Sequence, residues 1–205
     1  MTKQNNLKSK RLLDFLIVLP SCLVLLPLMG IIWVAIKLTS KGPALFRQPR
    51  IGKDGRQFTM LKFRTMRADI NDSNLTKAVN TDGSSPALEK MKNDPRVTGV
   101  GKFLRKTSLD ELPQLFNIIA GSMSLVGPRP LMVFMINMND SRAQKRQSVL
   151  PGITGYWQIS ARDQNTSVES MYVYDLKYVE EVSAVTDIKI IIRTIPAVLF
   201  GGGAW

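Results

Sequence analysis

Two adjacent carboxylates, Asp110 and Glu111, lie in the stretch SLDELPQ and are the first side chains whose types suggest chemistry. The spacing predicts a helix over residues 110–120 with Asp110 as its N-cap, because Pro113 lacks an N–H and fits only the first turn. The amides and the positive dipole at a helix start favour anions, so they also favour a bound phosphate. Arg105 lies just upstream. Such carboxylates and cations are suited to hold a magnesium ion on a diphosphate.

An ordinary helix cap is the alternative for this pair. An Asp at the N-cap followed by a Glu is common where helices begin, so capping alone also accounts for the two residues. The motif VGPRP presents the same choice, since it holds Arg129 between two prolines. The prolines keep the backbone extended, which suits a fixed contact between a guanidinium and a phosphate, but a stiff turn needs no ligand. Both interpretations stay open on these motifs.

The composition restricts the partners and the metals that such a site can use. The chain has 205 residues, enough for one domain, and a net charge of +12, which indicates an acidic partner such as nucleic acid, anionic lipid or a phosphate-bearing substrate. It has no histidine and a single cysteine, Cys22, which excludes an internal disulfide and the usual zinc sites. A metal here would be a hard ion held by oxygen, with Mg²⁺ the first candidate and Mn²⁺ the second.

A long apolar segment near the N-terminus predicts membrane insertion. Residues 15–36 form a run of 22 residues without a charge, long enough for one helix to cross a bilayer. The run is too long for the apolar part of a signal peptide, and no small-residue cleavage site follows it. It is apolar on all sides, unlike the helix of a soluble core.

The topology of this segment has two solutions. Both of its flanks are basic, and the positive-inside rule would keep both in the cytoplasm, which a single straight span does not allow. Pro20 and Pro27 lie inside the run, and each removes a helix hydrogen bond. A re-entrant helix that breaks near Pro27 and returns to the same side satisfies the charges and the prolines. An ordinary span with tolerated prolines is the alternative.

Basic residues continue beyond this segment in a predicted β-hairpin. Asp54 and Gly55 form a turn signal, and Gln57–Phe63 alternates as a strand does. Lys62 and Arg64 add positive charge there, either on a solvated hairpin or in a binding site.

The remaining segments are predicted to form one long polar loop and several helices. Residues 68–95 predict a loop with a short helix near 87–91, and residues 97–105 predict another short helix. Residues 166–182 also have a helical pattern. The final stretch, TDIKIIIRTIPAVLF, is apolar with two cations four residues apart, which fits a helix in the membrane interface or a helix docked on the core.

Taken in chain order, these motifs resemble the bacterial sugar transferase family, the monotopic polyprenyl-phosphate glycosyl-1-phosphate transferases. The resemblance covers nearly the whole chain, as the small single-domain form, and rests on these stretches: KRLLDF, the proline-broken apolar helix, GPALFRQPRIG, KFRTM, NDPRVTGVGKFLRKTSLDELPQLFNIIAGSMSLVGPRP, PGITGYWQISAR and YDLKYVEEVSAVTDIKIIIRTI. The sequence departs from the family at Leu26, where Ser is common before the break proline, and at Ser122, where Asp is frequent.

The resemblance implies a reaction and its residues. Such enzymes move a sugar-1-phosphate from a UDP-sugar to undecaprenyl phosphate and release UMP, the first membrane step in making a surface glycan such as exopolysaccharide, capsule or O-antigen. Asp110 would be the nucleophile and a metal ligand, and Glu111 would hold Mg²⁺. Pro27 would be the membrane break. The implied contacts to the diphosphate or the nucleotide are Arg105, Lys62, Arg64, Arg129 and Arg162.

We therefore expect an α/β, largely helical fold. Residues 1–40 form the basic flank and re-entrant helix, and residues 41–205 form one cytosolic catalytic unit with a β-hairpin and amphipathic interfacial helices. The expected location is the cytoplasmic face of the bacterial inner membrane, with membrane lipids as partners. A second copy of the chain and downstream glycosyltransferases are further candidate partners. Two rivals are a membrane-tethered nucleic-acid-binding module, for which no recognised motif is present, and a non-catalytic membrane adaptor, which leaves the acidic pair without a purpose.

Overall fold

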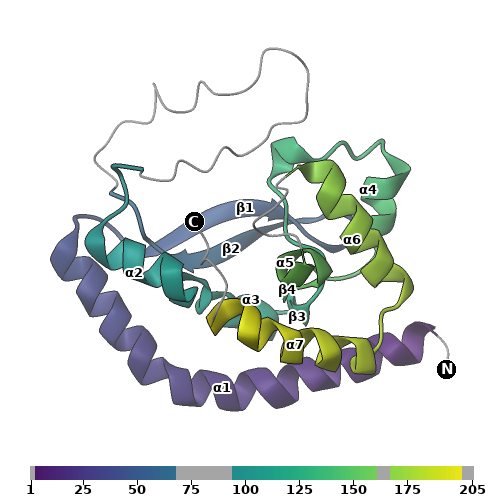
Figure 1. Ribbon diagram of the computed structural model, residues 1–205, viewed down its shortest axis with the longest axis horizontal. Helices are drawn as coiled ribbons and strands as arrows, with labels where there is room; N and C mark the ends of the chain where they lie inside the picture. The colour runs from purple at the N-terminus through teal and green to yellow at the C-terminus, as the bar shows by residue number, and fades with distance from the viewer. Residues whose placement is uncertain (1–2, 68–93, 161–166, 200–205) are drawn as a thin grey trace.

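The protein is described by a computed structural model, which covers residues 3–67, 94–160 and 167–199 (Figure 1). Its longest element is helix α1, Lys3–Thr39, which contains the apolar run and meets the length and composition of a membrane helix. Figure 1 shows α1 curved along one side of the molecule, with both of its ends turned towards the body of the protein. The other helices and the strands lie on the concave side of this curve.

The expected interruption of α1 at Pro27 is wrong, because the helix continues through both Pro20 and Pro27. Proline removes one backbone hydrogen bond and bends a helix without having to end it. Tertiary packing holds both halves of α1 in place, since side chains before and after Pro27 are buried against the body. The buried stripe consists of Lys10, Asp14, Val18, Cys22, Met29, Ile32 and Ile36. The outward face is apolar and exposed, and its largest side chains are Leu12, Leu16, Leu19, Leu23, Val24, Leu26, Ile31, Trp33, Val34 and Leu38.

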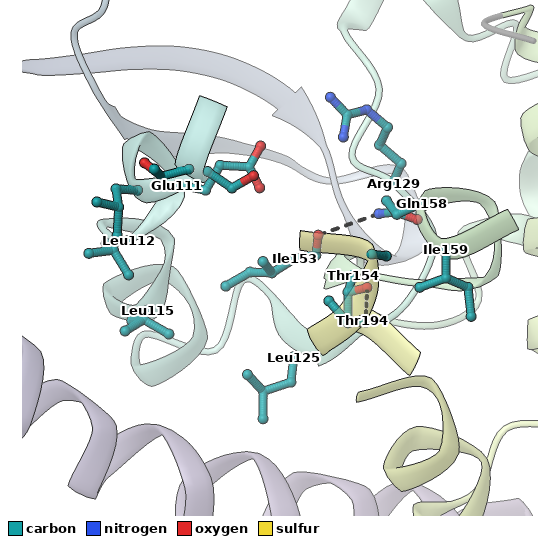
Figure 2. Close-up of a pocket in the computed structure, with 14 residues that line it drawn as sticks. Glu111, Leu112, Leu115, Leu125, Arg129, Ile153, Thr154, Gln158, Ile159 and Thr194 are labelled. Atoms are coloured by element: carbon teal, nitrogen blue, oxygen red, sulfur yellow. Dashed lines mark hydrogen bonds between the residues drawn. The ribbon is translucent and has the colours of Figure 1, made fainter. Parts of the chain in front are cut away.

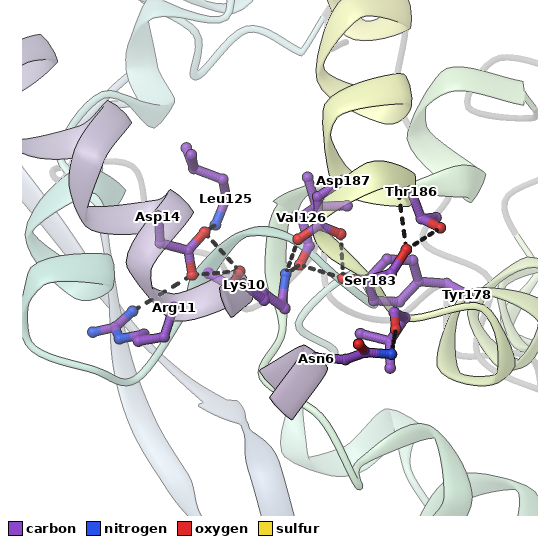
Figure 3. Close-up of polar contacts among 12 residues, drawn as sticks. Asn6, Lys10, Arg11, Asp14, Leu125, Val126, Tyr178, Ser183, Thr186 and Asp187 are labelled. Carbon is purple, nitrogen blue, oxygen red and sulfur yellow. Dashed lines mark hydrogen bonds and ion pairs between the residues drawn. The ribbon is translucent and has the colours of Figure 1, made fainter. Parts of the chain in front are cut away.

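A buried polar network fastens the start of α1 to the rest of the protein (Figure 3). The Lys10 ammonium donates to Asp187 Oδ2 at 2.6 Å and to the Val126 carbonyl at 2.7 Å. The Tyr178 hydroxyl donates to the other oxygen of Asp187 at 2.8 Å. Asp14 accepts bonds from the Ser124 hydroxyl and the Leu125 amide. Buried charges are tolerated when they are paired and hydrogen-bonded in this way.

The predicted hairpin is confirmed. Strands β1, Leu45–Ile51, and β2, Gln57–Phe63, pair antiparallel, and the short 3₁₀ turn η1, Lys53–Gly55, joins them. Asp54 and Gly55 both have positive φ, the conformation for which Asp and Gly are favoured in tight turns. The register places Phe46 opposite Lys62, so the strand presents Lys62 one residue before its end.

A second pair of strands, which is parallel, leads into the VGPRP motif. Strand β3, Ser124–Val126, pairs with β4, Gly152–Thr154. The two backbones approach so closely that a Cβ on Gly152 would collide with the Gly127 backbone, so only glycine fits there. This crossing fixes the start of the loop that carries Arg129.

The fold is mostly helical, as expected, and helix α3 contacts both small sheets. The predicted helices at 97–105 and 166–182 are confirmed as α2 and α6 with slightly shifted bounds, whereas the segment 87–91 lies outside the described residues. The remaining elements, with bounds, are α2 Gly99–Thr107, η3 Leu109–Glu111, α3 Gln114–Ile119, η4 Val133–Met135, α4 Ser141–Arg146, α5 Tyr156–Ser160, α6 Val168–Glu180 and α7 Ala184–Leu199. Helices α2, α3 and α7 lie towards α1, and the β1–β2 hairpin, α4 and α6 lie farther from it (Figure 1).

Candidate active site

Asp110 lies in a tight turn between α2 and α3 and does not cap a helix, so the expected helix start at Asp110 is wrong. Ser108 ends α2 in a left-handed conformation, with φ of 56°, and the chain passes directly into the 3₁₀ turn η3. Helix α3 begins later, with Pro113 in the N-cap position. No side chain caps the start of η3 or the start of α3. The reversal at Ser108 turns Asp110 inward, where the side chain is buried.

The Asp110 carboxylate is buried beside a lysine and a second carboxylate. Its residue is 6% exposed, and its Oδ1 has no hydrogen-bond partner among the described residues. Its Oδ2 is 4.0 Å from Lys62 Nζ, which also donates to Glu111 Oε1 at 2.7 Å. Burial raises the pKa of Asp110 to about 6, and the neighbouring Glu111 also raises it, whereas the charges of Lys62 and Arg105 lower it.

Arg105 approaches the same carboxylate from the last turn of α2. Its Nε donates to Thr65 Oγ1 at 2.9 Å, which ties the arginine to the segment that follows β2. Helix α2 can lie against this segment because Gly101 has no Cβ, and any Cβ there would collide with the Thr65 carbonyl. Burial lowers the pKa of Arg105, and the charge of Asp110 opposes that effect. The structure thus brings together the Lys62, Arg105, Asp110 and Glu111 that the sequence analysis selected.

Arg129 completes this group from the opposite side. Its guanidinium lies over the Trp157 ring, 5.4 Å from the ring centre. The loop backbone is held on both sides of it, because Arg146 donates to the Arg129 carbonyl and Arg50 donates to the Pro130 carbonyl at 3.1 Å. Buried side chains therefore fix the place of Arg129, which agrees with the interpretation of VGPRP as more than a solvent-exposed turn.

Arg50 also belongs to this group, although it was not among the predicted site residues. It is 8% exposed and lines a small polar cleft that Lys62, Glu111 and Arg129 also line. Burial and the nearby Arg129 lower its pKa to about 10, and the charge of Glu111 acts in the opposite direction. The sequence offered one signal, since Arg50 belongs to the GPALFRQPRIG stretch, but the other basic residue there, Arg47, is exposed.

Two expected contacts are not found in this group. The Arg64 guanidinium turns to the end of α1 and donates to the Ser40 carbonyl at 2.9 Å and to its hydroxyl at 2.7 Å. Lys62 and Arg64 therefore serve different parts of the protein although they are two residues apart. Arg162 lies outside the described residues.

The two carboxylates fit a magnesium ion that is shared with a substrate. Asp110 Oδ1 is buried and has no partner in the described part of the chain, so it is available as a ligand. No cluster of three or more carboxylate, cysteine or histidine ligands occurs among the described residues. Mg²⁺ commonly uses one or two carboxylates together with substrate phosphates and water, so two suffice.

A cavity of about 340 Å³ opens beside these charged groups. Figure 2 shows Glu111 on one wall and Arg129 on the other, with aliphatic side chains below them. A buried carboxylate, four nearby cations and an adjoining apolar cavity can bind a phosphorylated substrate that has an apolar part.

Comparisons with known proteins identify a family for this chain. Residues 5–201 match the family model described as bacterial sugar transferase. The chain is 42% identical over 207 residues to the galactosyl transferase CpsE of Streptococcus agalactiae serotype III (strain NEM316), covering 98% of this chain and 44% of the relative. It is 41% identical over 201 residues to the exopolysaccharide production protein ExoY of Rhizobium meliloti (strain 1021), covering 96% and 88%.

A third relative is the UDP-glucose:undecaprenyl-phosphate glucose-1-phosphate transferase of Escherichia coli (strain K12), 40% identical over 196 residues, which cover 91% of this chain and 39% of the relative. The chain thus spans less than half the length of the CpsE and E. coli proteins and most of ExoY. The family match extends over nearly every residue, including the carboxylates and the surrounding cations. The chain belongs to the bacterial sugar transferase family.

Proposed function

We propose that this protein transfers a sugar-1-phosphate from a UDP-sugar to undecaprenyl phosphate, giving a polyprenyl-diphosphate sugar and UMP. The observation that carries the proposal is the buried Asp110, whose Oδ1 has no partner in the described part of the chain and whose neighbours are Lys62, Arg105 and Glu111. The E. coli relative is named for this transfer with glucose, and a Salmonella typhimurium relative is named undecaprenyl-phosphate galactose phosphotransferase.

The reaction would proceed in two displacements at phosphorus. At pH 7 Asp110 is mostly ionised, because its pKa is about 6. In the first step a carboxylate oxygen attacks the phosphorus that bears the sugar, and the bond from that phosphorus to UMP breaks, with the electron pair leaving on UMP. In the second step an oxygen of undecaprenyl phosphate attacks the same phosphorus and displaces the Asp110 carboxylate. Lys62, Arg105 and Arg129 would neutralise charge on the phosphates.

Asp110→Asn tests the nucleophile against a structural role. The neutral amide is a far poorer attacker, so turnover of UDP-glucose or UDP-galactose with undecaprenyl phosphate should fall by at least about a thousandfold. Asp140→Asn is the matched control, since Asp140 caps α4 by accepting from the Arg142 amide and Asn caps equally well. If Asp110→Asn keeps the activity of the parent, Asp110 is not the nucleophile.

We further infer that Asp110 and Glu111 hold Mg²⁺, or Mn²⁺, on the diphosphate. The bound ion would offset the negative charge of the donor and of the departing UMP. Excess EDTA should stop UMP release and added Mg²⁺ should restore it. Glu111→Gln should raise the Mg²⁺ concentration needed for half-maximal rate. Full activity in EDTA would remove the metal from the proposal.

We also infer that α1 returns to the side from which it enters through its continuous curve, without a break at Pro27, and that both of its ends lie on the cytoplasmic face of the inner membrane. The support is the exposed apolar face of α1, its two basic flanks and the turn of both ends towards the body (Figure 1). Asn5→Cys and Arg47→Cys should therefore both resist a membrane-impermeant thiol reagent in intact cells. The parent is the control, because its single cysteine, Cys22, is buried. Labelling at residue 5 alone would establish a straight span.

A further inference from the structure

The cavity beside the charged group has a polar end and a long apolar wall (Figure 2). Glu111 and Arg129 lie at the polar end. The hydroxyls of Thr154 and Thr194 bond to each other at 2.7 Å, and the Thr194 hydroxyl also bonds to the Ile190 carbonyl at 2.8 Å, so both hydroxyls are already paired. Three further polar residues, Thr107, Ser108 and Gln158, line it, and the other lining residues are aliphatic: Leu109, Leu112, Leu115, Leu125, Ile153, Ile159 and Ala197.

Two of the helices that contribute to the walls of this cavity, α3 and α7, also carry exposed apolar side chains. Helix α3 exposes Phe116 and Ile119, which are 39% and 37% exposed. Helix α7 exposes Ile192 and Ile195, at 61% and 56%. Both helices pack against α1, whose outward face is apolar, and the three lie together along one side of the molecule (Figure 1). A lipid chain in the bilayer would therefore meet the side of the protein on which this cavity lies.

We propose that this cavity binds the isoprene units next to the phosphate of the acceptor, with that phosphate at the Glu111–Arg129 end. The proposal rests on the transfer to undecaprenyl phosphate proposed above. Charge supports this orientation, because Arg129 and the neighbouring Arg50 favour a phosphate at that end, whereas the aliphatic wall favours hydrocarbon. At ~30 Å³ per heavy atom, the cavity takes roughly two five-carbon units.

The sugar of the donor is the rival occupant. Gln158 lies in the wall, and its Oε1 is buried without a hydrogen-bond partner among the described residues, so it could accept a bond from a sugar hydroxyl. The isoprenoid is favoured because seven of the fourteen lining residues are aliphatic and the hydroxyls of Thr154 and Thr194 already bond to each other. A sugar would therefore bury hydroxyls against hydrocarbon, and a buried hydroxyl without a partner is costly. The two occupants predict different labelling and different kinetics.

A photoreactive probe tests binding directly on the parent protein in detergent. The probe is a two-unit isoprenyl phosphate with a diazirine on the second unit. Labelling is expected on peptides that contain Leu112 and Leu115, Ile159 or Ala197, and undecaprenyl phosphate should compete with it. Labelling only on the outward face of α1, or competition by UDP-glucose and not by undecaprenyl phosphate, would overturn the proposal.

Kinetics of two phenylalanine variants on α7 give an independent test. Ala197→Phe fills the cavity, whereas Ile195→Phe adds the same ring on the exposed face of the helix. Ala197→Phe should raise the acceptor KM at least about tenfold more than the donor KM, and Ile195→Phe should change both by less than about twofold. A rise in the donor KM alone would assign the cavity to the sugar and overturn the proposal.

The two tests also separate this inference from the proposed reaction. If the parent releases no UMP from any UDP-sugar but undecaprenyl phosphate still competes with the label in the cavity, the reaction is wrong and the binding site stands. If Ala197→Phe fails to fold, Ile159→Phe fills the same cavity from α5 and should give the same selective rise in acceptor KM. An unchanged acceptor KM in a folded cavity variant would refute the site.

Discussion

Lys62 should keep Asp110 ionised at neutral pH, and Lys62→Met removes its charge while keeping most of its stem. Its ammonium is 4.0 Å from Asp110 and is shared with Glu111 at 2.7 Å. An opposite charge within about 4–6 Å lowers a carboxyl pKa by roughly 1–3 units. Because Glu111 shares this ammonium and the Lys62 side chain is 20% exposed, the lower limit applies. The pKa of Asp110 should rise from about 6 to roughly 7.

The assay is the pH dependence of kcat/KM for the UDP-sugar, which reports ionisations of the free enzyme. In the parent this value should fall below about pH 6, as Asp110 becomes protonated. In Lys62→Met the fall should begin about one pH unit higher. Lys62→Arg is the matched control, because it keeps the charge and should keep the parent profile. If Lys62→Met leaves the acid limb in place, whatever its effect on the plateau, Lys62 does not set the pKa of Asp110 and the reasoning is refuted.

Three further variants test other parts of the structure. Burial raises the pKa of Asp110 from 3.8 to about 6, so the native state loses ~3 kcal/mol of stability as the pH rises through this window to pH 7. Asp110→Asn should therefore have a higher melting temperature than the parent at pH 7 and the same melting temperature below pH 4. A lower melting temperature at pH 7 would contradict this. Lys10→Met leaves Asp187 buried without its cation and should lower the free energy of unfolding by about 3–5 kcal/mol. The double variant Lys10→Met/Asp187→Leu should recover more than half of this loss, and additive losses would refute the pairing. Arg146→Lys keeps the charge but gives up its bond to the Arg129 carbonyl, so kcat/KM should fall roughly tenfold without loss of folding, and an unchanged value would show that this bond does not position Arg129.

Local rules predicted the hairpin and the long apolar helix because their causes are local. Asp54 and Gly55 tolerate positive φ, and a tight turn between alternating segments needs little else. The length and composition of α1 follow from an uninterrupted run of apolar residues. Its continuity through Pro27 did not follow from this run, because packing on both sides of the proline holds the helix together.

The candidate site depends on contacts between segments that are far apart in the sequence, so local rules predicted it only in part. The pair Asp110–Glu111 and its cations Lys62 and Arg105 were found from motifs, but the helix-cap rule misplaced the start of α3. The left-handed turn at Ser108 decides that placement, and few residue types other than glycine signal such a turn.

The two buried arginines that hold the VGPRP loop illustrate the same difficulty. Arg50 reaches a carbonyl 80 residues away in the chain, and Arg146 reaches one 17 residues away. Each lies near an exposed basic residue, Arg47 in one case and Lys145 in the other, so composition cannot distinguish a buried guanidinium from a solvated one. Arg64 shows the converse, since its motif suggested a substrate contact and its hydrogen bonds go to Ser40.

The covalent intermediate on Asp110 is the central claim, and a single-turnover measurement without acceptor tests it most directly. Parent protein with UDP-sugar and Mg²⁺, but without undecaprenyl phosphate, should release about one equivalent of UMP per protein. Mass spectrometry of the quenched protein should find the sugar-phosphate on the peptide that contains Asp110, and added undecaprenyl phosphate should remove it. Release of UMP only when the acceptor is present, with no adduct on that peptide, would contradict the two-step reaction and favour direct transfer.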